Sequence, residues 1–272
     1  MLIDAGGHRL YLELFGRGAP TVIFDAGLSD AADRWYAVPA LVAEFAQVCI
    51  YDRAGLGRSE AGPLPRTSAR IVADLHAVLA RAGIVPPYVL VDHSFGGQNV
   101  RLYASRYPEE VAGLVLVDAQ HPDLARRFAA ILTPAEWEQL RAGYSRNREG
   151  ADLLASDAEM SAATPVPAVP LITLARGIPP RAEDFPPDWP IAALEEIWQT
   201  LQVQLAASSP YGIRWQAEQS GHYIQRDEPE LVVAAIKRAV GLRIRSNASL
   251  PRQLIKPRIA EILVEEGAQV GR

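Results

Sequence analysis

A serine at a strand-to-helix junction is the first feature of this sequence that could do chemistry. An apolar run leads into DHSFGG at positions 92–97, and a helical pattern follows from Gln98 to Tyr107. Such a junction holds a serine in strained backbone geometry and exposes its hydroxyl beside a helix N-terminus, provided that small residues lie where strand and helix crowd together. Gly96 is one such residue, whereas Asp92 stands where a G-x-S-x-G pattern has its first glycine. We predict that Ser94 is a nucleophile.

A histidine after a later strand supplies a candidate base. A serine hydroxyl is a weak nucleophile near neutral pH and needs a base within hydrogen-bond reach. His222 follows the strand-like run Ile213–Ala217 and precedes a helical pattern at Pro229–Val240, which places it at the same carboxyl edge of a parallel sheet as Ser94. The remaining histidines fit this role less well: His8, His76, His93 and His121. No two of the five histidines have the i, i+4 spacing of metal ligands, and we expect no metal.

The elements that must position these groups alternate along the chain. Seven short apolar runs are predicted as strands: Arg9–Phe15, Thr21–Asp25, Val48–Asp52, Tyr88–Asp92, Gly113–Asp118, Leu171–Ala175 and Ile213–Ala217. Between them lie stretches with apolar residues three and four apart, such as Thr67–Gly83, where Thr67 or Ser68 could cap the helix. This alternation predicts an α/β fold with a mostly parallel sheet. Only residues 16–20 join the first two runs, which we therefore expect to form an antiparallel pair.

The alternation stops after Asp118 and resumes at Leu171. Helical patterns at Leu124–Leu132 and Pro134–Tyr144 occupy the interval. We predict an α/β core of residues 1–119 and 170–242, a helical cap at 120–169, and a C-terminal extension at 243–272 of unassigned role. Candidate pocket-wall residues from the cap are Phe128, Leu132, Trp137, Leu140 and Met160.

Composition excludes several classes of protein. Hydrophobic residues at 49% and charged residues at 22% are close to globular averages, which argues against disorder, coiled coil and collagen. A net charge of -5 and only two lysines disfavour nucleic acid as a partner. The single cysteine, Cys49, cannot form an internal disulfide. Residues 1–7 lack a signal pattern and no run of ~18 apolar residues occurs, so we expect a cytoplasmic protein with no membrane partner.

Residues 8–240 resemble the α/β-hydrolase family. The resemblance rests on DAGL at 25–28, YDRAGLGRS at 51–59, the turn at Ser94, and SGH at 220–222. It implies an eight-stranded, mostly parallel sheet flanked by helices, with a helical cap inserted after the sixth strand. It also implies a catalytic triad in the chain order serine, acid, histidine.

The same resemblance implies an oxyanion hole made by two backbone N–H groups, which map onto Leu28 and Phe95. In the family, the loop that carries the first of these N–H groups usually opens with a histidine. Here Asp25 or Ala26 stands in its place. Backbone donors survive such a change of side chain.

The acid of the triad has two candidates, because such hydrolases place it after either of two strands. Asp118 directly ends the run Leu114–Val117, whereas Asp184 arrives late after the run Leu171–Ala175, behind a proline pair. We favour Asp118 and keep Asp184 as the alternative. The acid would accept a hydrogen bond from His222, which fixes the imidazole tautomer and stabilises the imidazolium.

Asp92 has two interpretations. It is either a strand-end carboxylate bonded to nearby backbone, which we favour, or a group close enough to His222 to influence its titration. In both cases the turn must provide room or a polar partner for a buried carboxylate.

The predicted function is that of a carboxylesterase-type serine hydrolase. It would cleave small to medium acyl or aryl esters by two-step acyl transfer, with a small-molecule substrate and no cofactor. Serine at the turn argues against the epoxide-hydrolase and dehalogenase branches, which need a carboxylate nucleophile. Hydrolysis of a lactone, a thioester, a carbon–carbon bond or an N-terminal peptide stays open as an alternative, as does a low-turnover ligand-binding module of the same fold. The oligomeric state stays open too.

Overall fold

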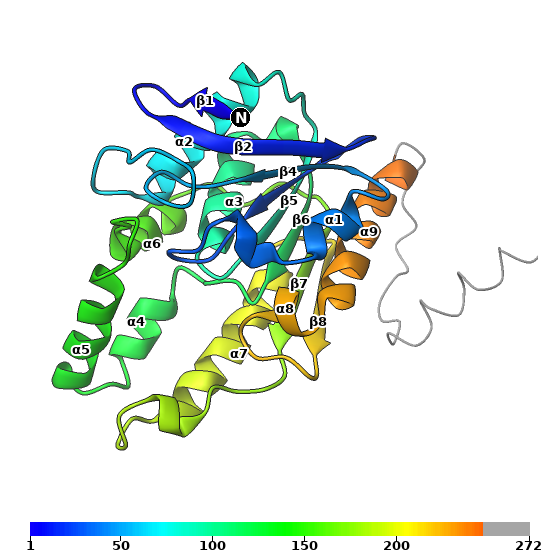
Figure 1. Cartoon of the computed structure of the whole chain (residues 1–272). Helices are drawn as coiled ribbons and strands as arrows, with labels where there is room; N and C mark the ends of the chain where they lie inside the picture. Colours follow the sequence, from blue (N-terminus) through cyan, green and yellow to red (C-terminus); the bar gives the residue numbers. More distant parts are fainter. Residues whose placement is uncertain (247–272) are drawn as a thin grey trace, which may run out of the picture.

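The computed structural model describes residues 1–246, whose strands form one sheet with helices on both faces (Figure 1). The strands are β1 (Leu2–Asp4), β2 (Arg9–Gly16), β3 (Thr21–Asp25), β4 (Gln47–Tyr51), β5 (Tyr88–His93), β6 (Val111–Val117), β7 (Leu171–Arg176) and β8 (Gly212–Ala217). The helices are α1 (Val38–Val42), α2 (Ser68–Arg81), α3 (Gly96–Arg106), α4 (Leu124–Ala129), α5 (Pro134–Ser145), α6 (Leu153–Ser161), α7 (Ile191–Ala207), α8 (Ile224–Asp227) and α9 (Pro229–Ser246). The predicted extension lies outside the described residues from position 247 onward, and its first residues continue α9.

The sheet has the strand order β1-β2-β4-β3-β5-β6-β7-β8. Strands β3 to β8 run parallel, and β1 and β2 form an antiparallel edge. This confirms the predicted α/β class with an eight-stranded, mostly parallel sheet. The seven predicted strands agree with the observed ones to within two residues at either end. The short edge strand β1 was not predicted.

The predicted antiparallel pair of Arg9–Phe15 with Thr21–Asp25 is wrong, because β4 lies between β2 and β3. A few extended residues at ~3.3 Å each can pass over one intervening strand, since neighbouring strands lie only ~4.8 Å apart. Helix α1 then returns the chain so that β4 fills the gap. The short link at 17–20 therefore fixes the opposite directions of β2 and β3 but not their adjacency.

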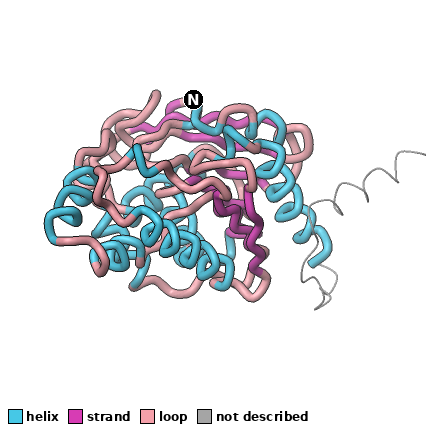
Figure 2. Tube along the Cα trace, turned by 90° about the horizontal axis from the view of Figure 1, so that it is seen from below, coloured by secondary structure: helices cyan, strands magenta, loops and turns pink. Residues whose placement is uncertain are grey.

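Two apolar layers hold the helices to the sheet. One layer packs α2 and α3 against one face, and the other packs α1 and α9 against the opposite face. Neighbouring residues of β6 serve both layers, with Leu114 in the first and Val115 in the second. Strands covered on both faces must be apolar throughout, which explains the continuous apolar runs. Figure 2 shows the strands as a band with helices to either side.

The helices of the segment from 120 to 169 pack against two different parts of the core. Helix α4 packs against α7, with Phe128 and Trp198 in one apolar cluster. Helix α6 instead packs against α2 and α3, and Met160 belongs to the core layer on that face. In Figure 1, α4 and α5 project beyond the sheet together with α7.

No helix within residues 1–246 is long and apolar enough to cross a membrane.

The apolar layers predict the cost of a cavity in β5. Leu90 is 0% exposed in the layer beneath α2 and α3. Leu90→Ala should lower the free energy of unfolding by about 2–5 kcal/mol, through lost burial and the cavity left behind. Urea denaturation measures this difference. Val203→Ala on α7, where the side chain is 55% exposed, is the matched control and should change stability by less than about 0.5 kcal/mol. Equal midpoints for the two variants would contradict the assignment of Leu90 to the core.

Candidate active site

Ser94 occupies the turn between β5 and α3 in a strained conformation. Its φ is 54°, in the left-handed region that non-glycine residues rarely adopt. The turn is crowded on both sides: a Cβ at Gly96 would lie 2.6 Å from the backbone oxygen of Asp25, and a Cβ at Gly97 would lie 2.6 Å from Cβ of Ala119. Only glycine fits at either position. This crowding holds the serine at the apex of the turn.

Gly97 also makes room for Asp92, which is fully buried. A Cβ at Gly97 would lie 2.9 Å from Oδ1 of Asp92. Burial and the nearby Asp25 raise the pKa of Asp92 well above its ordinary range, and the cation of Arg101 only partly opposes them. The neutral acid is therefore favoured. Neither carboxylate oxygen has a hydrogen-bond partner of normal geometry within the described residues, so the predicted bond to nearby backbone is not formed, and the charged groups that act on Asp92 are Asp25 and Arg101.

His222 lies in the loop after β8 and pairs with Asp118. Nδ1 of His222 is 2.6 Å from Oδ2 of Asp118, which ends β6 and is fully buried. Because the carboxylate accepts the Nδ1 proton, Nε2 of the neutral imidazole is left as the basic nitrogen. His222 and Ser94 line the same cavity. Asp184 instead lies on an exposed turn, where it binds Arg181 at 3.1 Å.

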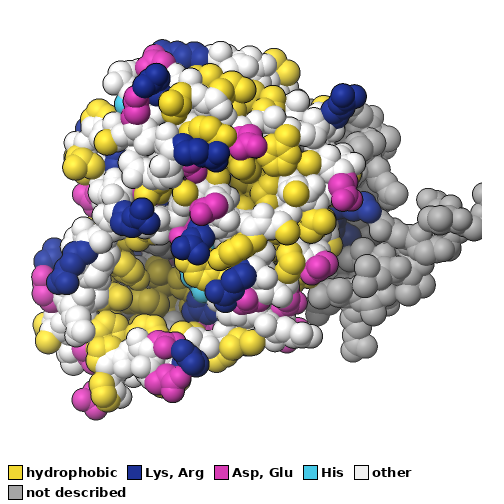
Figure 3. Space-filling view, viewed as in Figure 1, with side chains coloured by type: hydrophobic (Ala, Val, Ile, Leu, Met, Phe, Trp, Pro, Cys, Tyr) yellow, Lys and Arg dark blue, Asp and Glu magenta, His cyan; other side chains and the backbone are white. Residues whose placement is uncertain are grey.

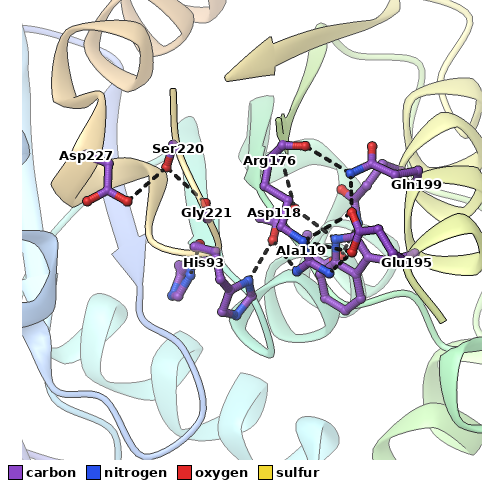
Figure 4. A network of polar contacts seen from close by, with 12 residues as sticks. His93, Asp118, Ala119, Arg176, Glu195, Gln199, Ser220, Gly221 and Asp227 are labelled. Atoms are coloured by element: carbon purple, nitrogen blue, oxygen red, sulfur yellow. Dashed lines mark hydrogen bonds and ion pairs between the residues drawn. The ribbon is translucent and has the colours of Figure 1, made fainter. Parts of the chain in front are cut away.

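Asp118 accepts further bonds from two residues that the sequence analysis missed. Nη1 of Arg176 donates to Oδ2 at 3.0 Å (Figure 4), and Nε1 of Trp198 donates to Oδ1 at 2.9 Å. Burial raises the pKa of Asp118, but the hydrogen bond from His222 and the cation of Arg176 outweigh it and hold the pKa below its ordinary value. The acid is therefore ionised at neutral pH.

The two missed residues differ in how visible they were. Arg176 ends β7 next to the end of β6, so its place at the carboxyl edge could have been inferred from the strand pattern. Trp198 reaches Asp118 from the middle of α7, 80 residues along the chain, and no local pattern signals that contact.

His93, directly before Ser94, holds the loop that carries His222. Nε2 of His93 lies 2.9 Å from the backbone oxygen of His222, and the two rings lie 4.6 Å apart (Figure 4). Burial and the nearby imidazole of His222 lower the pKa of His93 to about 3. A neutral ring that donates from Nε2 satisfies this contact.

The two predicted oxyanion-hole residues pack together near the serine. Leu28, in the loop after β3, lines the cavity with Ser94. Phe95 follows Ser94, is fully buried, and shares one apolar cluster with Leu28. The structure thus brings both residues to the serine.

The cavity has a volume of about 330 Å³ and a largely apolar wall. Of the predicted wall residues, Phe128 and Leu140 line it, Leu132 and Trp137 pack in the cluster behind it, and Met160 lies in the core. The segment before and within α7 adds wall residues that were not predicted: Pro180, Phe185, Trp189, Ile191, Leu194, Glu195 and Trp198. Figure 3 shows the opening as a hollow floored by hydrophobic side chains.

Within the described chain, no group of three or more histidine, cysteine, aspartate or glutamate residues is arranged to hold a metal ion. The thiol of Cys49 is buried, which raises its pKa.

Comparison with known proteins places this geometry in a family. The family model of the α/β hydrolase fold matches residues 20–246. The uncharacterized protein YqjL of Bacillus subtilis is 30% identical over 229 residues, which cover 81% of this chain and 83% of YqjL.

Solved structures share the architecture. A thermophilic esterase from Thermogutta terrifontis matches with a TM-score of 0.64 and 20% identity, over 89% of this chain and 98% of the esterase chain. An enol-lactonase from Burkholderia xenovorans matches with a TM-score of 0.63 and 16% identity, over 89% of this chain and all (100%) of the lactonase chain. At these identities the likeness establishes the fold alone.

The buried His93 predicts a pH-dependent stability. Below pH ~6.5 the unfolded imidazole takes up a proton that the folded one refuses until about pH 3, so stability falls as the pH drops through that window. Between pH 6 and 4 this loss approaches about 1.4 kcal/mol per pH unit. His93→Gln keeps a donor but removes the titration, and its stability should depend less steeply on pH. Urea denaturation across this pH window measures how the free energy of unfolding changes with pH. Equal pH dependence in native protein and His93→Gln would contradict the prediction. His76→Gln, on the surface of α2, is the control.

Proposed function

The chain belongs to the α/β-hydrolase family, and from this premise we propose that it is a serine hydrolase that cleaves carboxylic esters. The observation that carries the proposal is the 2.6 Å contact between His222 and the buried Asp118, at a cavity that Ser94 also lines. These three residues would supply the nucleophile, the base and the buried acid that acyl transfer requires.

The chemistry follows from the orientation of His222. With Nδ1 bound to Asp118, Nε2 takes the hydroxyl proton as Oγ of Ser94 attacks the ester carbonyl. The N–H groups of Leu28 and Phe95 stabilise the oxyanion. His222 then returns the proton to the departing alcohol, and a water molecule activated by the same nitrogen cleaves the acyl-enzyme.

Arg176 and Trp198 serve this reaction by holding Asp118. Trp198 donates to Oδ1, and Arg176 donates to Oδ1 through its backbone N–H and to Oδ2 through its side chain. Oδ2 also accepts the hydrogen bond from Nδ1 of His222. A carboxylate with several donors stays ionised and cannot rotate freely. It therefore keeps the imidazole in one tautomer and favours the imidazolium that forms during turnover.

The cavity supports small to medium acyl or aryl esters as substrates. Its volume of about 330 Å³ admits a compact group, and its aromatic wall includes Phe128, Phe185 and Trp189. We assign residues 120–169, called the cap segment below, to the cover of this cavity, because Phe128 and Leu140 from that segment line it. The segment before and within α7 completes the cover.

The serine is tested with p-nitrophenyl esters from acetate to decanoate. Native protein should hydrolyse them with an optimum at short to medium chains, and Ser94→Ala should lose about 10³-fold or more in kcat at equal folded concentration, since it lacks the nucleophile. Ser105→Ala, farther along α3, is the matched control and should keep native turnover. Full activity in Ser94→Ala would overturn the assignment. If native protein were inactive on these esters but active on lactones or thioesters, the proposed substrate class would be wrong, and Ser94 would still be the proposed nucleophile.

The acid is tested by comparing two amide substitutions. Asp118→Asn should lower kcat by about 10³–10⁴-fold, because the amide no longer fixes the imidazole tautomer or stabilises its charged form. Asp184→Asn should keep native activity, since that side chain binds Arg181 on an exposed turn. Steady-state kinetics on folded protein, checked by circular dichroism, provides the comparison. The reverse pattern would make Asp184 the acid.

A further inference from the structure

Arg53 is a buried cation in contact with Phe95 and with the two residues that precede Leu28. It follows β4 and is 2% exposed. Nη1 donates to the backbone oxygen of Ala26, and Nη2 donates to that of Gly27, both at 2.6 Å. The guanidinium also stacks over the ring of Phe95, at 5.7 Å from its centroid. The guanidinium of Arg53 therefore contacts both Gly27, which precedes Leu28, and Phe95, which follows Ser94.

Glu149, from the cap segment, completes the hold on this loop. Its Oε2 accepts from Nε of Arg53 at 2.7 Å, and its Oε1 accepts from Nη2 of Arg53 at 2.7 Å and from the backbone N–H of Ser29 at 2.8 Å. The backbone N–H of Arg148 donates to Oγ of Ser29 at 2.9 Å. Leu28 thus lies between two anchored neighbours, Gly27 bound by Arg53 and Ser29 bound by Glu149.

The backbone of this loop needs such support. Ser29 has a φ of 62°, a left-handed conformation that a serine adopts at a cost. Asp25, where the family usually opens this loop with histidine, accepts from Nη1 of Arg53 at 2.6 Å and from the hydroxyl of Tyr51 at 2.9 Å. Charged hydrogen bonds in a dry interior are strong and costly to leave unmade, so the network fixes one loop geometry.

We propose that Arg53 and Glu149 are positioning residues that hold the Leu28 N–H toward the oxyanion, so that the cap segment supports the oxyanion hole without contacting the substrate. This inference rests on the proposed serine-hydrolase function. Neither side chain lines the cavity, so neither touches the substrate. Their loss should weaken binding of the transition state and leave binding of the ground state unchanged.

The coupling gives the cap segment a second role. When the 147–150 stretch moves away from the core, Ser29 loses both of its hydrogen bonds to the cap segment. The N–H of Leu28 is then no longer held in the direction of the oxyanion. The site therefore reaches full transition-state stabilisation only with the cap segment seated. Cover and catalysis are linked through one carboxylate.

The kinetic test substitutes Glu149 and leaves Arg53 in place, because removing the cation would strand two buried carboxylates. Glu149→Gln keeps the shape, and Glu149→Ala removes the acceptor. Both should lower kcat for p-nitrophenyl butyrate by about 10–100-fold, less than or comparable to the full loss of one oxyanion donor, with KM unchanged. Affinity for a trifluoromethyl ketone, which forms an oxyanion on Ser94, should fall by the same factor. Affinity for the matching methyl ketone should not change.

The matched control is Glu159→Gln. Glu159 also lies in the cap segment and accepts a core backbone N–H, that of Ala69, at 2.7 Å, but this contact is far from the Leu28 loop in the sequence and is not part of the cavity wall. It should keep native kinetics. A Glu149 variant that stays folded with native kcat would overturn the proposal, and so would a variant that loses affinity for both ketones equally.

Amide hydrogen exchange on the full chain tests the geometry without any turnover. Exchange at Ser29 should be about tenfold or more faster in Glu149→Ala, which removes the acceptor, than in native protein, whereas Glu159→Ala should accelerate Ala69 and leave Ser29 unchanged. Unchanged exchange at Ser29 would refute the anchoring role. Failure of the proposed function would look different: native protein would neither hydrolyse any ester nor label at Ser94 with a fluorophosphonate, while exchange at Ser29 would still decide whether Glu149 holds the loop.

Discussion

Burial of charge at the carboxyl edge of the sheet is the constraint on which the rest of the site depends. Asp25, Asp92 and Asp118 end or nearly end three neighbouring strands, and all three are fully buried. A carboxylate without water must be paired, bonded or neutralised. Asp25 is paired with Arg53, Asp118 is bonded to His222 and Arg176, and Asp92 is favoured in its neutral form. Each solution fixes a different part of the site.

The solution at Asp118 ties three elements together. Its donors come from the end of β7, from α7 and from the loop after β8. A shift of any one of them would remove a hydrogen bond from a buried, charged carboxylate, and bonds to buried charged groups are costly to lose. The hydrogen bonds that Asp118 accepts therefore set the position of the His222 imidazole, which lines the same cavity as Ser94. His93 adds a second tie to the same loop through the backbone oxygen of His222.

Steric crowding positions Ser94, the proposed nucleophile, whereas electrostatics positions His222, the proposed base. The strand, the helix and the Leu28 loop meet at Gly96 and Gly97 with no space for a Cβ, which leaves Ser94 in a left-handed conformation. The cavity beside it takes its wall from two parts of the chain, the segment with Phe128 and Leu140 and the segment with Trp189 and Trp198. Most of the wall thus comes from elements other than the turn at Ser94, which is how one fold accommodates many substrates, whereas Trp198 both lines the cavity and binds Asp118.

What the sequence by itself determined was local: which runs become strands, where the turn at Ser94 lies, and which histidine and aspartate end strands at the same edge. Those features follow from burial patterns and backbone conformation within a few residues. Tertiary structure alone decided that β4 separates β2 from β3, that Trp198 binds Asp118, and that Glu149 reaches Ser29 across 120 residues. Such partners are chosen by the packing of the whole chain, because the free energy of a buried hydrogen bond depends on every element that excludes water from it.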